Sequence, residues 1–557
     1  MKKIFSVLLC ALLAGSCALT GCGGEQSSAQ GETESQTSEV KPGNNVPDPI
    51  KGIKATASSD KYRNVYQIFV NSFCDSNGDG IGDINGIISQ LDYINDGDPE
   101  KGEDLGADAI WLTPVMPSKS YHKYDVEDYY DIDKNFGTLK DYEKLLSECH
   151  KRGINVIMDL VLNHISSQNP LFLKAVREVS EGKLDGNAQY FEVHKKDYFS
   201  SDTQVVNMGN DYVCEANFSL DMPEWNLNSD KTKEEFKKIS KFWLDKGVDG
   251  FRLDAVKYYN NKETDGVKFL KWFCDTCRGI KKDVYLVGED WSGDSEIESF
   301  YESGIDSLFA FKFATNTGAI VEGIDSQKGF SVVKKIKAYD KKMSALSDNY
   351  INAMFLSNHD QVRIANSLEA KGLDYEKFAA NVSMLAPGNS FIYYGEEIGM
   401  TAPQTDSDAY YRLPMVFDSG KLQKIDVPGT GESDNKAPSG GGVAQQLKED
   451  DSLLNHYRRI IQIKLQNPEI ARGSVAKQVK FDDTAIGAYV VEYKGSKLMV
   501  IHNFSTEDSE ELTITDEMLK NASVRADLPG DISYGHVELK NGKLTLPRHS
   551  SVILKGE

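Results

Sequence analysis

Short apolar runs recur along the chain from residue 65, and a polar loop and an amphipathic helical stretch follow each of them. Strands that alternate with helices predict a parallel sheet. A series of this length predicts a (β/α)8 TIM barrel of the α/β class, although a doubly wound open sheet has the same alternation. The predicted strands are Val65–Val70, Ala109–Val115, Asn155–Val161, Gly250–Val256, Val284–Asp290, Ser307–Phe313, Asn352–Asp360 and Asn389–Glu397.

Two segments depart from this alternation. The first, which follows the third predicted strand, is polar with scattered aromatic residues and predicts an inserted domain. In the last part of the chain the apolar positions have a period of two, and Lys494-Gly495 and Asn541-Gly542 are hairpin signals, which predicts an antiparallel β-sandwich. The expected domains are the barrel at 59–162 and 229–472, the inserted domain at 163–228 and the C-terminal β-sandwich at 473–557.

The N-terminal residues predict a processed and anchored end of the chain. Met1-Lys2-Lys3 is basic, and the apolar run that follows is too short for a comfortable transmembrane helix, so residues 1–21 resemble a signal peptide. Leu19-Thr20-Gly21-Cys22 resembles the bacterial lipobox, which implies a lipid on Cys22; the alternative is a chance cysteine after an ordinary secretory signal. Residues 22–58 are rich in Ser, Glu, Gln, Thr and Gly and predict a disordered tether. We expect a secreted protein that is lipid-anchored to the bacterial cell membrane and faces outward.

Composition limits the classes of partner. The 557 residues carry a formal net charge of −22, which disfavours nucleic acid and anionic membrane surfaces and suits a neutral substrate. Five cysteines lie outside the N-terminal segment, and an odd number argues against a full disulfide framework. Cys274 and Cys277 form a lone CxxC without a second ligand pair for zinc, so we expect free buried thiols.

Polar and charged side chains end several of the predicted strands. In a barrel the C-terminal ends of the strands meet on one face, where active sites lie. Each such residue alone could be a cap, or a structural ion pair in the case of Arg252 and Asp254, but their joint occurrence predicts a catalytic face. Arg252 and Asp254 are two apart on one strand and share a side, which favours the charged Asp254 that a nucleophile requires. The strand-end residues are Asn163, His164, Arg252, Asp254, Glu289, Asp290, Asn358, His359 and Asp360.

Four motifs at these strand ends resemble those of the α-amylase family, glycoside hydrolase family 13, and the resemblance extends over residues 60 to 557. The motifs are Asp159-Leu-Val-Leu-Asn163-His164, Gly250-Phe-Arg252-Leu-Asp254, Val287-Gly288-Glu289 and Phe355-Leu-Ser-Asn358-His359-Asp360. The resemblance implies that Asp254 is the nucleophile, Glu289 the acid/base and Asp360 the stabiliser of the transition state. A retaining glycosidase needs two carboxyl groups of opposite protonation, and we expect the neighbouring carboxylates to raise the pKa of Glu289.

The same resemblance implies the groups that hold the sugar. Tyr121-His122-Lys123-Tyr124-Asp125 resembles the family's sugar-binding loop after the second strand, and Arg412-Leu413-Pro414-Met415 resembles a further motif. Lys257 lies just past the nucleophile's strand, where its ammonium could donate to hydroxyls of the leaving sugar. The expected substrate contacts are His122, Tyr124, His164, Arg252, Lys257, His359 and Arg412.

An acidic loop after the first strand predicts a calcium site. Residues 75–83 alternate oxygen ligands as an EF-hand loop does, but Gly86 stands at the twelfth position in place of the bidentate Glu. Related oligoglucosidases have such a loop, which supports Ca²⁺ as a structural cofactor, whereas the alternative is a polar turn without metal. The expected ligands are the side chains of Asp75, Asn77, Asp79 and Asp83 and the carbonyl of Ile81. The family's other calcium site usually includes a His where this chain has Tyr258.

The expected function is retaining hydrolysis of α-1,4 bonds in starch-derived maltooligosaccharides, by a monomer that binds no nucleic acid. Ala255 follows the nucleophile as in relatives that cut α-1,4 bonds, whereas α-1,6-specific oligoglucosidases typically have Val there. An α-glucosidase, a neopullulanase or a glucanotransferase of the same family is the alternative. An inactive glucan-binding protein is a remote alternative, because such proteins usually lack part of the carboxylate set that is complete here.

Overall fold

The computed structural model of the chain describes residues 60–98, 103–403, 407–509, 511–514 and 521–556. The predicted signal peptide, the tether and the lipidation site at Cys22 lie outside these residues, and the domain boundaries remain predictions. No helix in the described part of the chain is both long and apolar enough to span a bilayer.

Eight parallel strands form the barrel that the alternation predicted. They are β1 (Asn64–Ile68), β2 (Ala109–Leu112), β3 (Asn155–Leu160), β7 (Gly250–Leu253), β8 (Tyr285–Gly288), β9 (Ser307–Leu308), β10 (Ala353–Phe355) and β11 (Asn389–Tyr393), in the order β10-β11-β1-β2-β3-β7-β8-β9. A parallel bridge between Phe309 and Ala353 joins the two end strands, and Ala310 N donates to Ala353 O at 3.0 Å. This closure excludes the open sheet. The strands are shorter than predicted because the polar residues at their C-terminal ends lie beyond the ladders.

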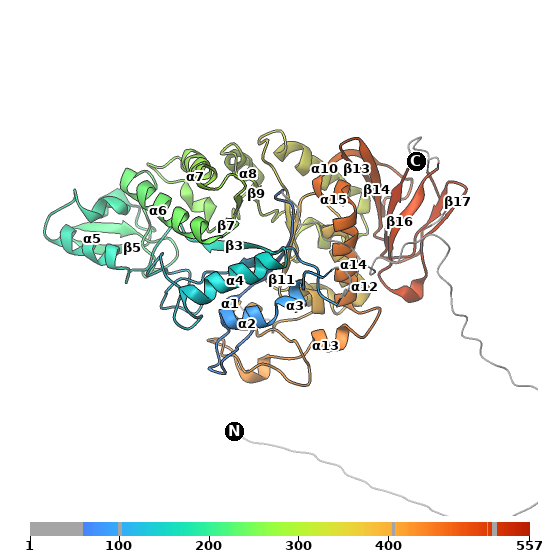
Figure 1. The fold of residues 1–557 in the computed structure, drawn as a ribbon. Coiled ribbons are helices and arrows are strands. Elements are labelled where there is room, and N and C mark those ends of the chain that lie inside the picture. Colours follow the sequence, from blue (N-terminus) through green and yellow to red (C-terminus); the bar gives the residue numbers. More distant parts are fainter. Residues whose placement is uncertain (1–59, 99–102, 404–406, 510, 515–520, 557) are drawn as a thin grey trace, which may run out of the picture. The chain divides into compact units, whose positions relative to one another are not determined.

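Helices cover the outside of the barrel (Figure 1). They include α1 (Val70–Phe73), α2 (Ile84–Ser89), α3 (Leu91–Ile94), α4 (Leu139–Lys151), α6 (Asp230–Lys246), α7 (Gly266–Ile280), α8 (Asp294–Tyr301), α9 (Ala319–Ser326), α10 (Gly329–Met343), α11 (Ile364–Leu368), α12 (Leu373–Met384), α13 (Val443–Gln446), α14 (Leu453–Gln466) and α15 (Pro468–Arg472). In α4, Tyr142, Leu145 and Cys149 recur at helical spacing and are buried, and Thr138 and Asp141 cap its first turn reciprocally.

Both faces of the barrel strands are buried, as a parallel sheet that is covered by helices requires. Trp111, Val287, Phe309, Phe355 and Phe391 belong to one apolar cluster inside the barrel. The alternate strand positions belong to the larger cluster that includes the helices. The barrel is thus a packed core, and its chemistry must lie at the strand ends.

The segment between β3 and α6 forms a small unit of its own. It contains α5 (Pro170–Ser180) and the antiparallel strands β4 (Val193–Lys195), β5 (Val205–Gly209) and β6 (Tyr212–Glu215), in the order β4-β6-β5 (Figure 1). Asn210 and Asp211 both have positive φ in the two-residue turn between β5 and β6, which suits a type I′ hairpin. A bridge between His164 and Glu224 ties the segment to the end of β3.

The C-terminal part of the described chain is antiparallel, as predicted, and its strands form two sheets. One sheet has the order β12 (Ser474–Val479), β13 (Ile486–Tyr493), β14 (Ser496–Asn503), β19 (Ser551–Lys555) and β16 (Ser523–Leu528). The other has the order β15 (Leu512–Thr513), β18 (Lys543–Thr545) and β17 (Glu538–Lys540). Ile501 and Val552 of the first sheet share an apolar cluster with Leu544 of the second. Both predicted turns form, with positive φ at Lys494 and Asn541.

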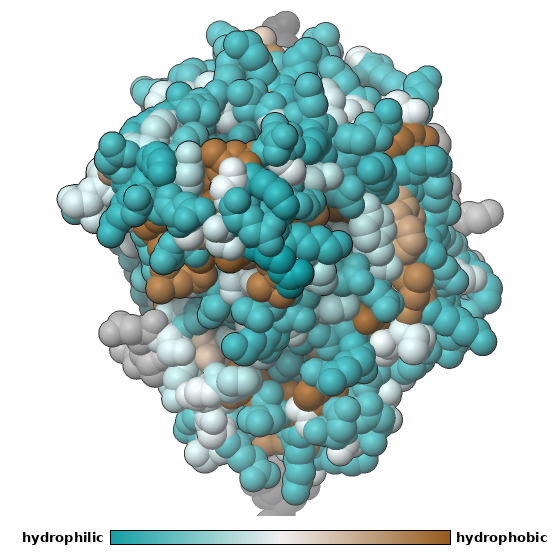
Figure 2. Space-filling view, turned by 90° about the vertical axis from the view of Figure 1, so that its left-hand side faces the viewer, coloured by the Kyte–Doolittle hydropathy of each residue, from teal (hydrophilic) through white to brown (hydrophobic). Residues whose placement is uncertain are grey.

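The polarity of the surface and the state of the cysteines agree with the expectations from composition. Figure 2 shows a mostly hydrophilic face on which hydrophobic residues form small, separate patches. The cysteines of the described residues are free and buried, as expected; they are Cys74, Cys149, Cys214, Cys274 and Cys277.

Candidate active site

Arg252, on β7, is the buried centre of a carboxylate cluster at the C-terminal end of the barrel. Its Nη1 lies 2.6 Å from Asp254 Oδ1 and 2.9 Å from Asp159 Oδ1. Its Nη2 lies 2.9 Å from Glu289 Oε2. The expected contact between Arg252 and Asp254 is therefore present, and one guanidinium connects carboxylates from the ends of β3, β7 and β8. Asp159 was not expected in the site.

Ala255 connects the same two strand ends through its backbone. The predicted strand extended to Val256, but β7 ends at Leu253, and Ala255 has φ 53° and ψ 40°. This left-handed conformation turns its N–H towards Glu289 Oε2, which accepts the hydrogen bond at 3.1 Å. A residue other than glycine in this region is uncommon and is often found at functional sites.

Burial dominates the protonation of Glu289. The pKa of Glu289 is raised to about 7 in total: burial is the largest cause, the Arg252 guanidinium opposes it, and Asp254 and Asp360 add to it. The neighbouring carboxylates, which we expected to be the cause, therefore contribute less than desolvation does. A carboxyl group with this pKa can give a proton near neutral pH and take it back.

Asp360 has the opposite electrostatics. Arg412 Nη2 lies 2.7 Å from Asp360 Oδ1 and 2.6 Å from Asp408 Oδ2. Burial works against the ionisation of Asp360, but the guanidinium groups of Arg412 and Arg252 hold its pKa below the usual value. In the same site the pKa values of Glu289 and Asp159 are thus raised to about 7, mainly by burial, whereas that of Asp360 is lowered.

The rings of His359 and Tyr124 are nearly parallel and offset, with centroids 5.6 Å apart and planes inclined by 5°. Tyr124 Oη lies 2.6 Å from His359 Nε2 and donates to Asp159 Oδ2 at 3.0 Å. The Gln67 amide nitrogen lies 2.8 Å from His359 Nδ1, so the ring accepts there and carries its proton on Nε2. Burial lowers the pKa of His359 to about 3, so the imidazole is neutral.

The other expected contacts surround this centre with different degrees of exposure. His164 is buried, and neither ring nitrogen makes a hydrogen bond of normal geometry with the described residues. His122 Nδ1 accepts from Tyr124 N at 3.2 Å. Lys257 is exposed and lies over the ring of Tyr258, and within the described residues it makes no hydrogen bond or ion pair with the carboxylates around Arg252. The buried His164 therefore has free polar capacity for a ligand, whereas Lys257 stands apart.

Two features of this site escaped the sequence reasoning. Asp159 begins the first of the four strand-end motifs, but its position within an apolar strand did not indicate its contact with Arg252. Trp291 follows Glu289 by two residues, is 52% exposed and stacks on Phe311 with centroids 5.1 Å apart and an 11° inclination. A large aromatic residue directly after a catalytic strand end is the signal that could have indicated it.

The predicted calcium loop has turns that suit a cation site. Asp75 Oδ2 accepts from Gly80 N at 2.8 Å, Asn77 Oδ1 from Asp79 N at 2.8 Å, and Asp79 Oδ1 from Ile81 N at 2.9 Å. Gly80, at the sixth position of the loop, has φ 87°, as the sharp turn of such loops requires. These hard oxygen donors fit calcium.

Two residues at the end of this loop differ from the expected pattern. Asp83 caps α2 through Gly86 N at 2.8 Å and accepts from Ser76 Oγ at 2.8 Å, so its oxygens already have partners. A Cβ at position 86 would lie 1.9 Å from Cys74 O, which explains why Gly86 replaces the Glu of an EF-hand.

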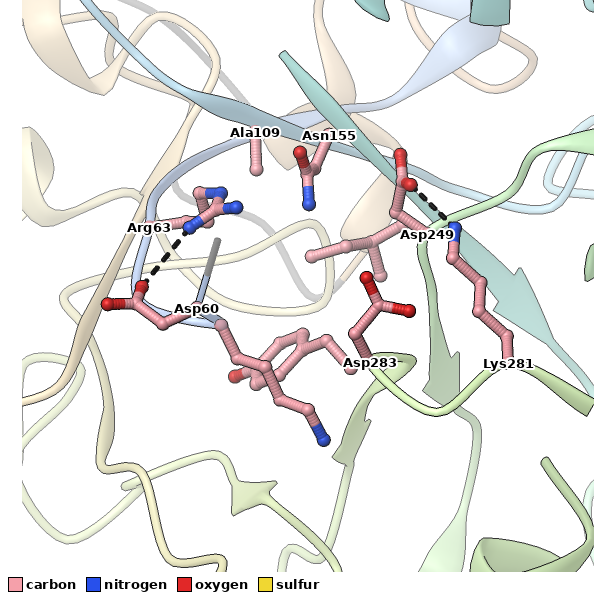
Figure 3. Close-up of a pocket in the computed structure, with 10 residues that line it drawn as sticks. Asp60, Arg63, Ala109, Asn155, Asp249, Lys281 and Asp283 are labelled. Carbon is pink, nitrogen blue, oxygen red and sulfur yellow. Dashed lines mark hydrogen bonds and ion pairs between the residues drawn. The ribbon is translucent and has the colours of Figure 1, made fainter. Parts of the chain in front are cut away.

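A pocket at the opposite end of the barrel serves packing rather than chemistry (Figure 3). Its lining includes Asn155 at the start of β3 and Asp249 just before β7. Lys281 Nζ lies 2.7 Å from Asp249 Oδ1, and Arg63 Nη1 lies 3.5 Å from Asp60 Oδ1. Residues at this end of a barrel usually contribute stability, and these ion pairs fit that role.

Comparisons with known proteins agree with this geometry. The catalytic-domain model of α-amylase matches residues 67–473, and the model of the α-amylase SusG C-terminal domain matches residues 486–553. Alpha-amylase 3 of Dictyoglomus thermophilum is 33% identical over 89% of this chain and 93% of its own length. An oligo-1,6-glucosidase of Bacillus cereus is 29% identical over 85% of this chain and 93% of its own length.

Solved structures give the same result. Eubacterium rectale Amy13B has a TM-score of 0.81 and 34% identity, and the match covers 91% of this chain and 97% of that one. The α-amylase from H. orenii has a TM-score of 0.77 and 34% identity over 89% of this chain and 100% of its own. The chain is a glycoside hydrolase and belongs to the α-amylase family, glycoside hydrolase family 13.

Proposed function

We propose that the protein is a retaining hydrolase that cleaves mainly the α-1,4 bonds of starch-derived maltooligosaccharides. The proposal rests on the contacts of one guanidinium group. Arg252 Nη1 lies 2.6 Å from Asp254 Oδ1, and Arg252 Nη2 lies 2.9 Å from Glu289 Oε2. The two carboxyl groups act on the same bond, and the pKa of Glu289, raised to about 7, suits it to be the proton donor of a retaining pair.

In the first step, Asp254 attacks the anomeric carbon while Glu289 gives its proton to the leaving oxygen. The bond between the anomeric carbon and that oxygen breaks, and a glycosyl ester forms on Asp254. Arg252 Nη1 pairs with Asp254 Oδ1 at 2.6 Å and orients it for the attack. The Ala255 N–H and Arg252 then stabilise the carboxylate that Glu289 has become.

In the second step, Glu289 takes a proton from a water molecule, which attacks the anomeric carbon and releases Asp254. Two displacements at the same carbon restore the α configuration. Asp360, held as an anion by Arg412, stabilises the positive charge that develops on the sugar ring in both transition states.

The surrounding side chains provide the sugar contacts. His164 has two buried ring nitrogens that can pair with hydroxyl groups, which would remove their desolvation cost. Tyr124, stacked on His359, presents an aromatic face at the cleavage point, with His122 beside it. The exposed Trp291 offers a further aromatic face on the side of Glu289. Lys257 remains a proposed donor to the leaving sugar.

The linkage is the finer part of this proposal. The relatives include proteins named α-amylases and proteins named oligo-1,6-glucosidases, so the names alone do not choose a bond type. Ala255 beside the nucleophile favours α-1,4 bonds. Specificity constants on maltotriose and isomaltotriose test this, and a clear preference for isomaltotriose would overturn it. Product analysis over time distinguishes hydrolysis from transfer, because a glucanotransferase would form chains longer than its substrate.

Calcium and membrane attachment complete the proposal. Asp75, Asn77, Asp79 and the Ile81 carbonyl would hold a structural Ca²⁺, with Asp83 in contact directly or through water. A lipid on Cys22 would anchor the enzyme to the outer side of a bacterial membrane, where its substrate is available. Detergent-phase partitioning of the native chain against Cys22→Ala tests the anchor, and a native chain that stays in the aqueous phase would refute it.

A further inference from the structure

We propose that Glu192, His194 and Glu263 form a binding site for a divalent transition-metal ion, best matched by Zn²⁺. The site would join the inserted segment to the loop that follows the nucleophile. It is separate from the acidic loop at residues 75–83 and from the carboxylates around Arg252.

The three side chains come together from two distant parts of the chain. Glu192 directly precedes β4, and His194 lies on that strand. Glu263 lies in the loop between the 3-10 helix η3 (Val256–Tyr259) and α7 (Gly266–Ile280). One ligand atom of each lies within 4.8 Å of the other two. Among the residues that the structure describes, no other three carboxylates, imidazoles or thiols meet this spacing.

Each of the three ligands has an outer partner that fixes its orientation. Asn261 Nδ2 donates to Glu192 Oε1 at 3.0 Å, and the Tyr198 hydroxyl donates to Glu263 Oε1 at 3.2 Å. The Tyr198 ring also stacks on His194, with centroids 3.9 Å apart and an inclination of 10°. Such outer contacts are typical of metal sites, because they hold the ligands and tune their basicity.

The side chains around His194 carry more negative than positive charge, which a bound cation would balance. His194 Nε2 lies 3.2 Å from Glu192 Oε2, and His194 Nδ1 lies 4.0 Å from Glu263 Oε1, so two carboxylates flank one imidazole. Lys262 is the nearby ammonium, and it donates to the Tyr198 carbonyl at 2.9 Å. Glu192 is 3% exposed, so its charge has little help from solvent. A divalent ion would neutralise this excess.

The ligand set selects the class of ion. One imidazole nitrogen and two carboxylates are ligand types that zinc binds, and a water molecule would complete its four-coordinate geometry. Calcium prefers six to eight oxygen ligands, and an imidazole suits transition metals better. Glu263 lies in the connection between β7 and α7, which begins at Asp254, so the ion would fix this connection against the inserted segment. Its role would be structural, because none of its ligands contacts the carboxylates around Arg252.

The test uses the full chain after removal of metals with EDTA. Calorimetric titration with Zn²⁺ alone should show one site that Glu263→Gln or His194→Gln weakens at least 10-fold, and Zn²⁺ should raise the Tm of the native chain but not of these variants. Asp197→Asn, which removes an exposed carboxylate on the same segment, is the matched control and should bind zinc as the native chain does. Asp79→Asn should also leave zinc binding unchanged, which separates this site from the acidic loop.

Several results would overturn the proposal. Equal zinc affinity in the native chain and in Glu263→Gln would place the ion elsewhere. No saturable zinc binding, or a rise in Tm with Ca²⁺ that Glu263→Gln abolishes, would mean that the cluster is an ion pair or an oxygen site for a different cation. Glu263 is 45% exposed at its side chain, so its Gln variant tests the site even if His194→Gln does not fold.

Discussion

Arg252 Nη2 lies 2.9 Å from Glu289 Oε2, so the proposed proton donor has a cation beside it in the resting enzyme. An adjacent cation lowers the pKa of a carboxyl group, yet the pKa of Glu289 is raised to about 7 because burial outweighs this pair. The contact between Arg252 and Glu289 has a further role, because it stabilises the Glu289 carboxylate that remains after the proton has left.

The pH dependence of catalysis follows from this balance. Glu289 is protonated below its raised pKa and loses its proton as the pH rises through about 7. The kcat/KM for maltotriose should therefore fall on the alkaline side with an apparent pKa near 7. A profile measured from about pH 5 to pH 9 checks this, and a constant value up to pH 9 would exclude Glu289 as the group that must be protonated.

Asp159 is predicted to position Arg252. Asp159→Asn keeps the shape but removes the charge that faces Arg252 Nη1 at 2.9 Å and the carboxylate acceptor of the Tyr124 hydroxyl. We expect kcat to fall by about 10²-fold with a smaller change in KM, because the guanidinium and the ring would shift. Asp249→Asn at the opposite end of the barrel is the control; it should lower Tm and leave kcat near the native value. Equal effects of the two variants on kcat would contradict a positioning role.

Most of the barrel strands were predictable from the sequence, because they are apolar runs that end in polar residues. Asp254, Glu289 and Asp360 were identifiable for the same reason. Ala255 was not, because its left-handed backbone has no sequence signal in a residue other than glycine. The pKa of Glu289 is raised mainly by burial, and burial depends on the folded structure rather than on the neighbouring residues in the sequence.

In the C-terminal sheets, some strands were predictable from the sequence and others were not. The strands β13 and β14 were predicted because a Lys494-Gly495 turn separates two alternating runs. Ser474–Val479, Ser523–Leu528 and Ser551–Lys555 were missed, since no short turn joins any of them to its partner along the chain. Pairing between distant strands is set by packing rather than by local pattern.

Buried carboxyl groups should make the fold less stable as the pH rises. Burial raises the pKa of Glu396 to about 8, although Ser357 and Tyr457 donate hydrogen bonds to it. A folded pKa above the unfolded value of about 4.3 means that the stabilising contribution is complete below that value and is lost as the pH rises through about 8. The native Tm should therefore fall between about pH 5 and pH 8, and less so in Glu396→Gln. The exposed Glu538→Gln is the control, and identical slopes in all three proteins would contradict the assignment.

Calcium should stabilise the chain through the acidic loop. Asp79→Ala removes one oxygen donor, and a chelator should lower the Tm of the native chain but not of this variant. At a calcium concentration of 100 times Kd, the stabilisation of the native chain should be about 2.7 kcal/mol. The measurement is a thermal scan with and without Ca²⁺, together with elemental analysis. An unchanged native Tm and the absence of bound calcium would mean that the loop is a turn that needs no metal.

The covalent intermediate on Asp254 is the central claim, and one experiment addresses it directly. Glu289→Gln, incubated with α-maltosyl fluoride, should form the ester, because fluoride leaves without a proton; the ester should accumulate, because water then lacks its base. Mass spectrometry of the digested protein should show a maltosyl adduct on the peptide that contains Asp254, and Asp254→Asn should show none. Turnover of native substrate should fall by about 10³-fold or more in both variants. An adduct on a different residue, or an unmodified peptide together with products of inverted configuration, would contradict the account.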